Sequence, residues 1–137
     1  HVKQVIHVMA QKGWDRRTGQ VIEIVPLIRP YGIEPGFVFV GQAFLEGKPL
    51  EGATVEVEKY WPKAAREEDL PDEAMITRTA KTGPNGLIIY TLDEPGWWVI
   101  CVSAEHGEMK HNGKSYPLEI RGLFWIHVEE PFTQKIR

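Results

Sequence analysis

The chain has 137 residues, of which 42% are hydrophobic and 26% are charged, and its formal net charge is −3. This size is usual for one domain, and this composition excludes the collagen-like and disordered classes. Basic and acidic residues are interleaved, which excludes a phosphate-binding stripe for nucleic acid, and no apolar stretch reaches the roughly 20 residues of a bilayer span. We therefore predict a single domain over residues 1–137 that does not insert directly into a membrane.

The first part of the chain predicts strands. Two segments rich in β-branched residues, Val2–Met9 and Val21–Ile28, flank a polar loop. Pro26 cannot donate a ladder hydrogen bond, so it should lie at an edge, a bulge or the end of its strand. Alternating apolar residues predict two further strands over Phe37–Leu45 and Thr54–Trp61, the second of them half-exposed.

Residues 62–74 (PKAAREEDLPDEA) are highly charged and are broken by Pro71. A stretch this short and polar does not form a stable core helix, so we expect a short helical or irregular insertion at the surface. Its acidic run lacks the alternating spacing of a calcium-binding EF-hand loop and is interpreted as a solvated face.

The strand pattern returns in the second half of the chain. Met75–Lys81 and Leu87–Leu92 flank Asn85-Gly86, which is typical of a tight hairpin turn, so we expect these two segments to pair. Trp97–Ala104 is the most apolar segment and is predicted to be a central strand. Its expected partner is Leu118–Val128, across a polar hairpin loop over residues 105–117.

About seven or eight closely spaced strands, without helix–strand alternation, predict an all-β fold. We expect an antiparallel Greek-key β-sandwich of the immunoglobulin-like or transthyretin-like kind, with a small closed barrel as the alternative. Cys101 lies in an apolar alternating run, where a buried, inert thiol is expected. The chain contains no nucleophile elbow, phosphate loop, Cys-x-x-Cys or His-Glu-x-x-His motif, so we predict that it is not an enzyme.

Two stretches, GKPLEGATVEVE and TGPNGLIIYTLDEPGWWVICV, resemble the transthyretin-like or collagen-adhesin-B-like sandwich repeat. Together with VIEIVPLIRPYGIEPGFVFVGQAFLEGKPLEGATVEVE and RGLFWIHVEEP, they resemble a family of bacterial periplasmic proteins associated with cobalt and nickel uptake of the ABC or ECF type. The resemblance covers nearly all of Gln20–Pro131. It implies a periplasmic or extracytoplasmic location, an accessory role and a membrane permease or other transport component as partner. It also implies that this segment, which begins with His1 in place of Met, is the C-terminal part of a longer exported protein.

Nickel and cobalt accept imidazole readily and carboxylate less so, which makes the histidines the candidate ligands. His106, Glu108 and His111 fall within six residues of the expected 105–117 loop, beside Met109, and flanking glycines could let their side chains converge on Ni²⁺ or Co²⁺. No established ligand spacing is matched. The alternative is a solvated polar loop with incidental histidines.

The other histidines are weaker candidates. His7 and His127 lie in predicted strands and are expected to be hydrogen-bonded in or near the core. The expected pairing places His127 opposite Trp97 and far from His106, which excludes one four-histidine site. His1 could chelate a metal only if it were a genuine mature terminus.

Aromatic content suggests a second class of function. Exposed indoles stack on sugar rings in many β-sandwich carbohydrate binders, and the chain has five tryptophans. Trp97, Trp98 and Trp125 fall in predicted strands, where core packing or an interface is expected, with at least one of the first two in the core. Trp14 and Trp61 lie near loops. The main hypothesis is thus a non-catalytic periplasmic binding domain associated with nickel or cobalt uptake, and the alternative is a carbohydrate-binding or adhesive module of a larger surface protein.

Overall fold

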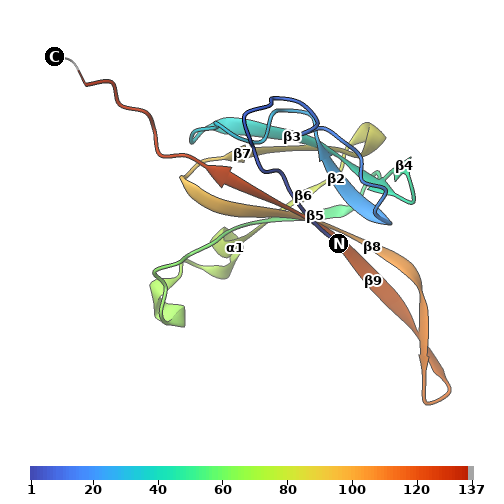
Figure 1. The fold of residues 1–137 in the computed structure, drawn as a ribbon. Helices are drawn as coiled ribbons and strands as arrows, with labels where there is room; N and C mark the ends of the chain where they lie inside the picture. Colours follow the sequence, from blue (N-terminus) through green and yellow to red (C-terminus); the bar gives the residue numbers. More distant parts are fainter. Residues whose placement is uncertain (136–137) are drawn as a thin grey trace.

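The computed structural model describes residues 1–135 and is an all-β sandwich of two sheets, as the sequence predicts (Figure 1). One sheet has five strands in the order β1-β9-β8-β5-β6, and the other has four, in which β3 pairs with β2, β4 and β7. Apart from the parallel pair β1–β9, the pairs are antiparallel. In chain order the elements are β1 (Val2–Gln4), β2 (Ile22–Pro26), β3 (Phe37–Leu45), β4 (Lys48–Pro49), β5 (Thr54–Lys59), the 3-10 helix η1 (Glu67–Asp69), α1 (Glu73–Ile76), β6 (Thr77–Lys81), the 3-10 helix η2 (Pro84–Gly86), β7 (Leu87–Leu92), β8 (Gly96–His111) and β9 (Lys114–Val128).

The core lies between the inner faces of the two sheets and follows from strand alternation. Val55 and Val57 of β5 are fully buried, while their neighbours in the strand are partly exposed, because successive side chains point to opposite faces. Phe39 of β3 and Phe124 of β9 meet across the sandwich with ring centroids 5.8 Å apart, and the fully buried Trp98 belongs to the same core cluster. Burial of each such side chain stabilises the fold by about 1.5–3 kcal/mol.

The N-terminal segment is less regular than predicted. The expected strand Val2–Met9 is reduced to β1, which ends at Gln4, because Ile6 and the residues after it leave the sheet and are exposed. The expected strand Val21–Ile28 is confirmed as β2 in a shorter form. Pro26 is its last residue, and β2 is an edge strand, both of which the missing N–H of proline favours.

The hairpin expected around Asn85-Gly86 is wrong in its pairing. The turn has the predicted geometry, with φ of 57° at Asn85 and 75° at Gly86. However, β6 pairs with β5 in one sheet and β7 pairs with β3 in the other. The turn therefore carries the chain from one sheet of the sandwich to the other.

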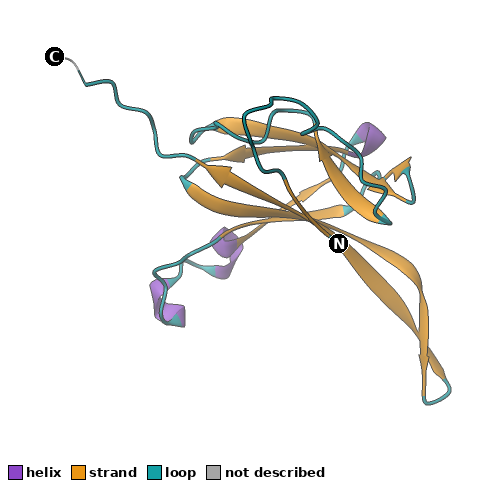
Figure 2. Cartoon of the chain, viewed as in Figure 1, coloured by secondary structure: helices purple, strands orange, loops and turns teal. Residues whose placement is uncertain are grey.

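The polar loop expected over residues 105–117 is also wrong. Strands β8 and β9 continue as an antiparallel ladder to a two-residue turn at Asn112-Gly113, where φ is 49° and 75°. A β-bulge between Glu105 and Glu108 shifts the register by one residue. We call residues 105–119 the arm, because they project from the body of the sandwich (lower right in Figure 2). Elsewhere the prediction is confirmed, since β8 is the central strand of its sheet and β9 is its partner.

The insertion after β5 is confirmed as short and irregular. It contains only η1 and α1, of three and four residues, and it stands apart from the sandwich at the lower left of Figure 2. Within residues 1–135, no helix combines the length and apolar character needed to cross a membrane.

Candidate functional site

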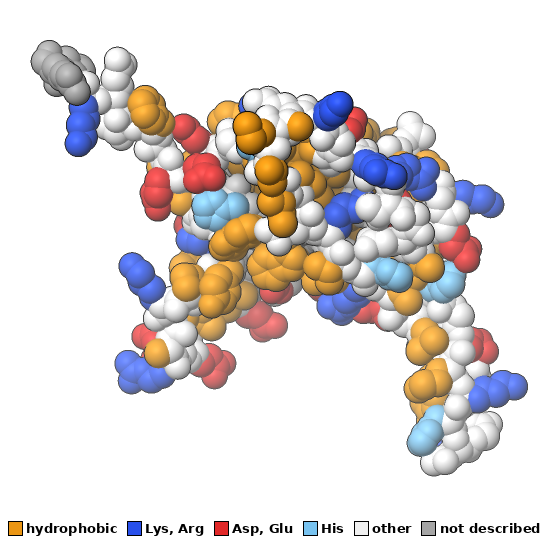
Figure 3. Space-filling view, viewed as in Figure 1, with side chains coloured by type: hydrophobic (Ala, Val, Ile, Leu, Met, Phe, Trp, Pro, Cys, Tyr) orange, Lys and Arg blue, Asp and Glu red, His pale blue; other side chains and the backbone are white. Residues whose placement is uncertain are grey.

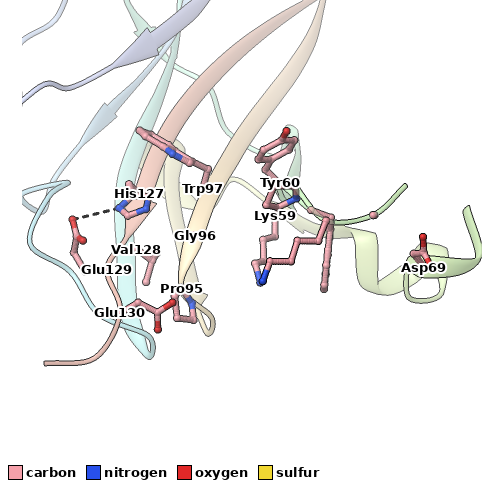
Figure 4. Close-up of a pocket in the computed structure, with 14 residues that line it drawn as sticks. Lys59, Tyr60, Asp69, Pro95, Gly96, Trp97, His127, Val128, Glu129 and Glu130 are labelled. Carbon is pink, nitrogen blue, oxygen red and sulfur yellow. Dashed lines mark hydrogen bonds and ion pairs between the residues drawn. The ribbon is translucent and has the colours of Figure 1, made fainter. Parts of the chain in front are cut away.

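A cavity of about 800 Å³ opens on the outer face of the five-stranded sheet, where the sheet meets the insertion (Figure 4). One wall is formed by the start of β8 and the end of β9, and the other by the end of β5 and the insertion. We call it the aromatic cleft, because three aromatic rings and an imidazole line it, from Tyr60, Trp61, Trp97 and His127.

Strand alternation places Trp97 in the cleft. Trp98 points inward, is fully buried and donates its indole N–H to the Glu94 carbonyl oxygen at 3.0 Å. Its neighbour Trp97 must then point outward, and it is 38% exposed. The predicted pairing of Trp97 with His127 is confirmed, with ring centroids 4.9 Å apart. His127 is hydrogen-bonded as expected, with Nδ1 3.3 Å from the Glu129 carboxylate, but it lies half-buried on the outer face of the sheet rather than in the core.

The opposite wall of the cleft continues from β5. The Tyr60 backbone N–H donates to the Trp97 carbonyl oxygen at 2.8 Å, which ties the two walls together, while the Tyr60 side chain is 56% exposed. Lys59 Nζ lies 4.7 Å from the centre of the Trp61 ring and 2.6 Å from the Glu94 carboxylate. The indole N–H of Trp61 is enclosed and finds no acceptor in the part of the chain that the structure describes. A buried donor without an acceptor costs about 1–3 kcal/mol.

The rim of the cleft is polar. Lys63 and Asp69 belong to the insertion, and Glu129 and Glu130 follow β9, so donors and acceptors surround the apolar walls (Figure 4). An apolar hollow with a few polar groups around it is the usual form of a small-ligand site. Such a site can stack a flat ligand face against the rings and hydrogen-bond the ligand's edge.

The residues predicted to bind a metal lie in the arm, away from the cleft. His106 Nε2 is 3.0 Å from a Glu46 carboxylate oxygen, and the Glu108 carboxylate accepts a hydrogen bond from Ser115 Oγ at 2.6 Å. His111 pairs with Lys114 at the end of the ladder. Glu108 and His111 stand three residues apart on a strand and point to opposite faces, so the structure does not bring all three candidates together.

Among residues 1–135, no three side chains of His, Cys, Asp or Glu lie so that they could hold a metal ion together. His7, which was expected near the core, is exposed and stacks on Tyr31 with ring centroids 4.3 Å apart. Binding of Ni²⁺ or Co²⁺ by His106, Glu108 and His111 stays a prediction. The acidic run of the insertion forms the exposed helix η1.

The five tryptophans occupy three different settings: the core, the cleft face and a separate hollow. Trp61 lines the cleft, whereas Trp14 lines a separate hollow of about 260 Å³ near the N-terminus. Trp98 is in the core, as expected for at least one of the adjacent pair, whereas Trp97 and Trp125 lie on the outer face, where the expected interface stays a prediction. The adjacent pair Trp97-Trp98 already indicated an outward-facing tryptophan in the sequence, because in a strand only one of two neighbours can face the core.

The most strongly shifted carboxyl group is Glu23 of β2, which lies outside the cleft and is fully buried. Burial alone raises its pKa, but hydrogen bonds from Lys3 and Thr18 and the charge of Lys3 outweigh burial and lower the pKa to about 2. Lys3 Nζ lies 2.7 Å from the carboxylate, and the backbone N–H groups of Thr18 and Gly19 donate to it at 3.0 and 3.3 Å. Glu23 therefore anchors the N-terminal segment to the sandwich.

Cys101 is buried and free, as predicted. Burial raises the pKa of its thiol, which lowers the fraction of reactive thiolate. The thiol is therefore a packing group rather than a candidate nucleophile.

Comparison with known proteins gives one family. Searches of curated proteins and of solved structures find no match. The family described as a domain of unknown function, DUF4198, matches residues 1–106, a range that includes Tyr60, Trp61 and Trp97 of the cleft. Because the match covers more than half of the 137 residues, the chain belongs to the DUF4198 family.

Proposed function

We propose that this domain is a non-catalytic, extracytoplasmic binding module and that its ligand is a carbohydrate held in the aromatic cleft. The observation that carries the proposal is the convergence of Tyr60, Trp61, Trp97 and His127 on one cavity of about 800 Å³. Apolar side chains exposed singly are common on protein surfaces, whereas a contiguous group of them around a hollow usually marks an interaction site.

The chemistry of the cleft matches that of a sugar ring. A pyranose has C–H groups on its faces and hydroxyl groups around its edge, so it offers an apolar face to an indole and hydrogen bonds to the surroundings. In the cleft, Trp97 provides an exposed indole, and Lys63, Asp69 and Glu130 provide donors and acceptors at the rim.

The proposal is tested by titrating the purified domain with soluble oligosaccharides, using tryptophan emission and calorimetry. Trp97→Ala should lower the affinity about tenfold or more, because a stacked aromatic contact contributes on the order of 1 kcal/mol beyond the area that it buries. Trp14→Ala is the matched control, since Trp14 lines a different hollow. Circular dichroism should show that both variants stay folded. Equal affinities for the wild type and Trp97→Ala would contradict the proposal.

A second proposal, an accessory role in nickel or cobalt uptake, rests on the sequence resemblance and on the pairing of His106 with Glu46. An imidazole and a carboxylate whose atoms lie 3.0 Å apart are two of the donor types that Ni²⁺ and Co²⁺ accept. Titration with each metal should then show binding that is lost in the double variant His106→Ala/His111→Ala. Binding that persists in this variant, or no binding by the wild type, would reject these ligands.

A further inference from the structure

A second hollow adjoins the aromatic cleft on the same outer face of the five-stranded sheet. It has a volume of about 460 Å³ and shares Tyr60 and Trp97 with the cleft. Its other lining residues are Trp125, Val2 and Gln4. Tyr60 and Trp97 therefore stand between two neighbouring hollows and contribute to both.

The strand order and register place these residues along one oblique line across the sheet, because Trp97 is opposite His127 while Trp125 is opposite Val99, two residues farther along β8. Tyr60 follows β5, Trp97 is on β8, Trp125 is on β9, and Gln4 on β1 is the register partner of Trp125. These four strands are consecutive neighbours. At about 4.8 Å between neighbouring strands, the distance from β5 to β1 is roughly 14 Å. The part of the cleft formed by the insertion lies beyond β5 and extends the surface further.

The surface along this line is mainly apolar. The aliphatic side chain of Val2 is 59% exposed, and Trp125, which lines the same hollow, is only partly buried. Figure 3 shows hydrophobic side chains gathered over the middle of this face and continuing toward the insertion. Polar groups are concentrated at the cleft end, where Asp69, Glu129 and Glu130 lie, while the second hollow has the amide of Gln4.

We propose that the site binds an extended, flat chain of sugar rings, such as a β-1,4-linked glucan or N-acetylglucosamine chain, rather than one sugar. This inference rests on the carbohydrate-binding function proposed above. One end of the chain occupies the aromatic cleft between Trp61 and Trp97, and the next rings cross Tyr60 and Trp97 to stack on Trp125. A flat β-linked chain keeps successive ring faces against the sheet, whereas an α-linked chain curves away from it.

The experiment uses the domain with soluble β-1,4-linked glucose and N-acetylglucosamine oligomers, from the monosaccharide to the hexamer, followed by calorimetry. Affinity should rise with chain length and then level off. Trp125→Ala should lower the affinity for the hexamer about tenfold while leaving the affinity for the disaccharide within about twofold, because the disaccharide fits in the cleft alone. Trp61→Ala should lower the affinity for both the hexamer and the disaccharide. Trp14→Ala again serves as the control, and α-1,4-linked glucose oligomers of equal length test the shape requirement.

The outcomes separate this inference from the proposed function. Affinity that is independent of length, an unaffected hexamer in Trp125→Ala, or equal binding of α-linked chains would overturn the extended-chain site and leave carbohydrate binding standing. If no oligosaccharide of any linkage binds, both proposals fail.

Discussion

Replacing Glu23 by Gln tests the electrostatic anchor of the N-terminal segment. The side chain keeps its shape and still accepts hydrogen bonds, but Lys3, whose side chain is only 8% exposed, loses its counter-charge. The pKa of Glu23 falls from 4.5 to about 2 on folding. At 1.36 kcal/mol per pKa unit, the ionised carboxylate stabilises the folded state by about 3 kcal/mol at neutral pH. We expect Glu23→Gln to lower the free energy of unfolding by about that amount.

The pH dependence has a defined sign. The folded-state pKa of Glu23 lies below its unfolded value. The contribution of the ionised carboxylate to the free energy of unfolding is therefore complete above about pH 4.5 and is lost as the pH falls toward about 2. Urea unfolding, followed by tryptophan emission at several pH values, should show the wild type losing stability over this interval. The difference between the wild type and Glu23→Gln should shrink in parallel.

The matched control is Glu105→Gln, which removes an exposed carboxylate from the arm and should change stability by less than about 0.5 kcal/mol. A double-mutant cycle with Lys3→Met measures the coupling of the pair directly. A wild-type advantage over Glu23→Gln of under 1 kcal/mol at pH 7, or one that does not change between pH 5 and pH 2, would refute this reasoning.

Three further predictions concern the turn, the thiol and the arm. Gly86→Ala should destabilise the fold by more than Gly113→Ala in urea unfolding, because both glycines have φ of 75° but a Cβ at Gly86 would lie 2.4 Å from a backbone oxygen of Ala43, while Gly113 has open space. A thiol reagent should label Cys101 slowly in the native domain and rapidly in urea, and fast native labelling would contradict its burial. Replacing the arm, residues 105–119, by a two-residue turn should shift the free energy of unfolding by no more than about 1 kcal/mol, because its link to the β3–β4 turn is the exposed pair of His106 with Glu46. A variant that fails to fold would show that the arm is structural.

Features that depend on neighbouring residues were predictable from the sequence. The strands over residues 37–45 and 87–92 have the predicted bounds, because alternation and flanking turn residues act within a few positions. The end of β2 at Pro26 and the positive φ at Asn85 and Gly86 follow in the same way from proline and glycine chemistry.

Features that depend on distant partners were decided by the tertiary structure. A tight turn at Asn85-Gly86 is compatible with a hairpin. In the structure, however, the strand before the turn, β6, pairs with β5, and the strand after it, β7, pairs with β3. Residues 105–117 are a second example, because their polar composition is typical of a loop. In the structure they form strands, since the backbone groups of β8 and β9 hydrogen-bond to each other along the arm.

The candidate site shows the same division. Strand alternation alone indicates that one of Trp97 and Trp98 must face outward, and the predicted register brings His127 beside Trp97. The sequence does not indicate that Tyr60 and Trp61 close the other side, because that contact joins the end of β5 to a strand more than thirty residues away. Strand formation is governed by local alternation and turn chemistry, whereas a cavity requires the sheet order, which only the packing of the whole chain determines.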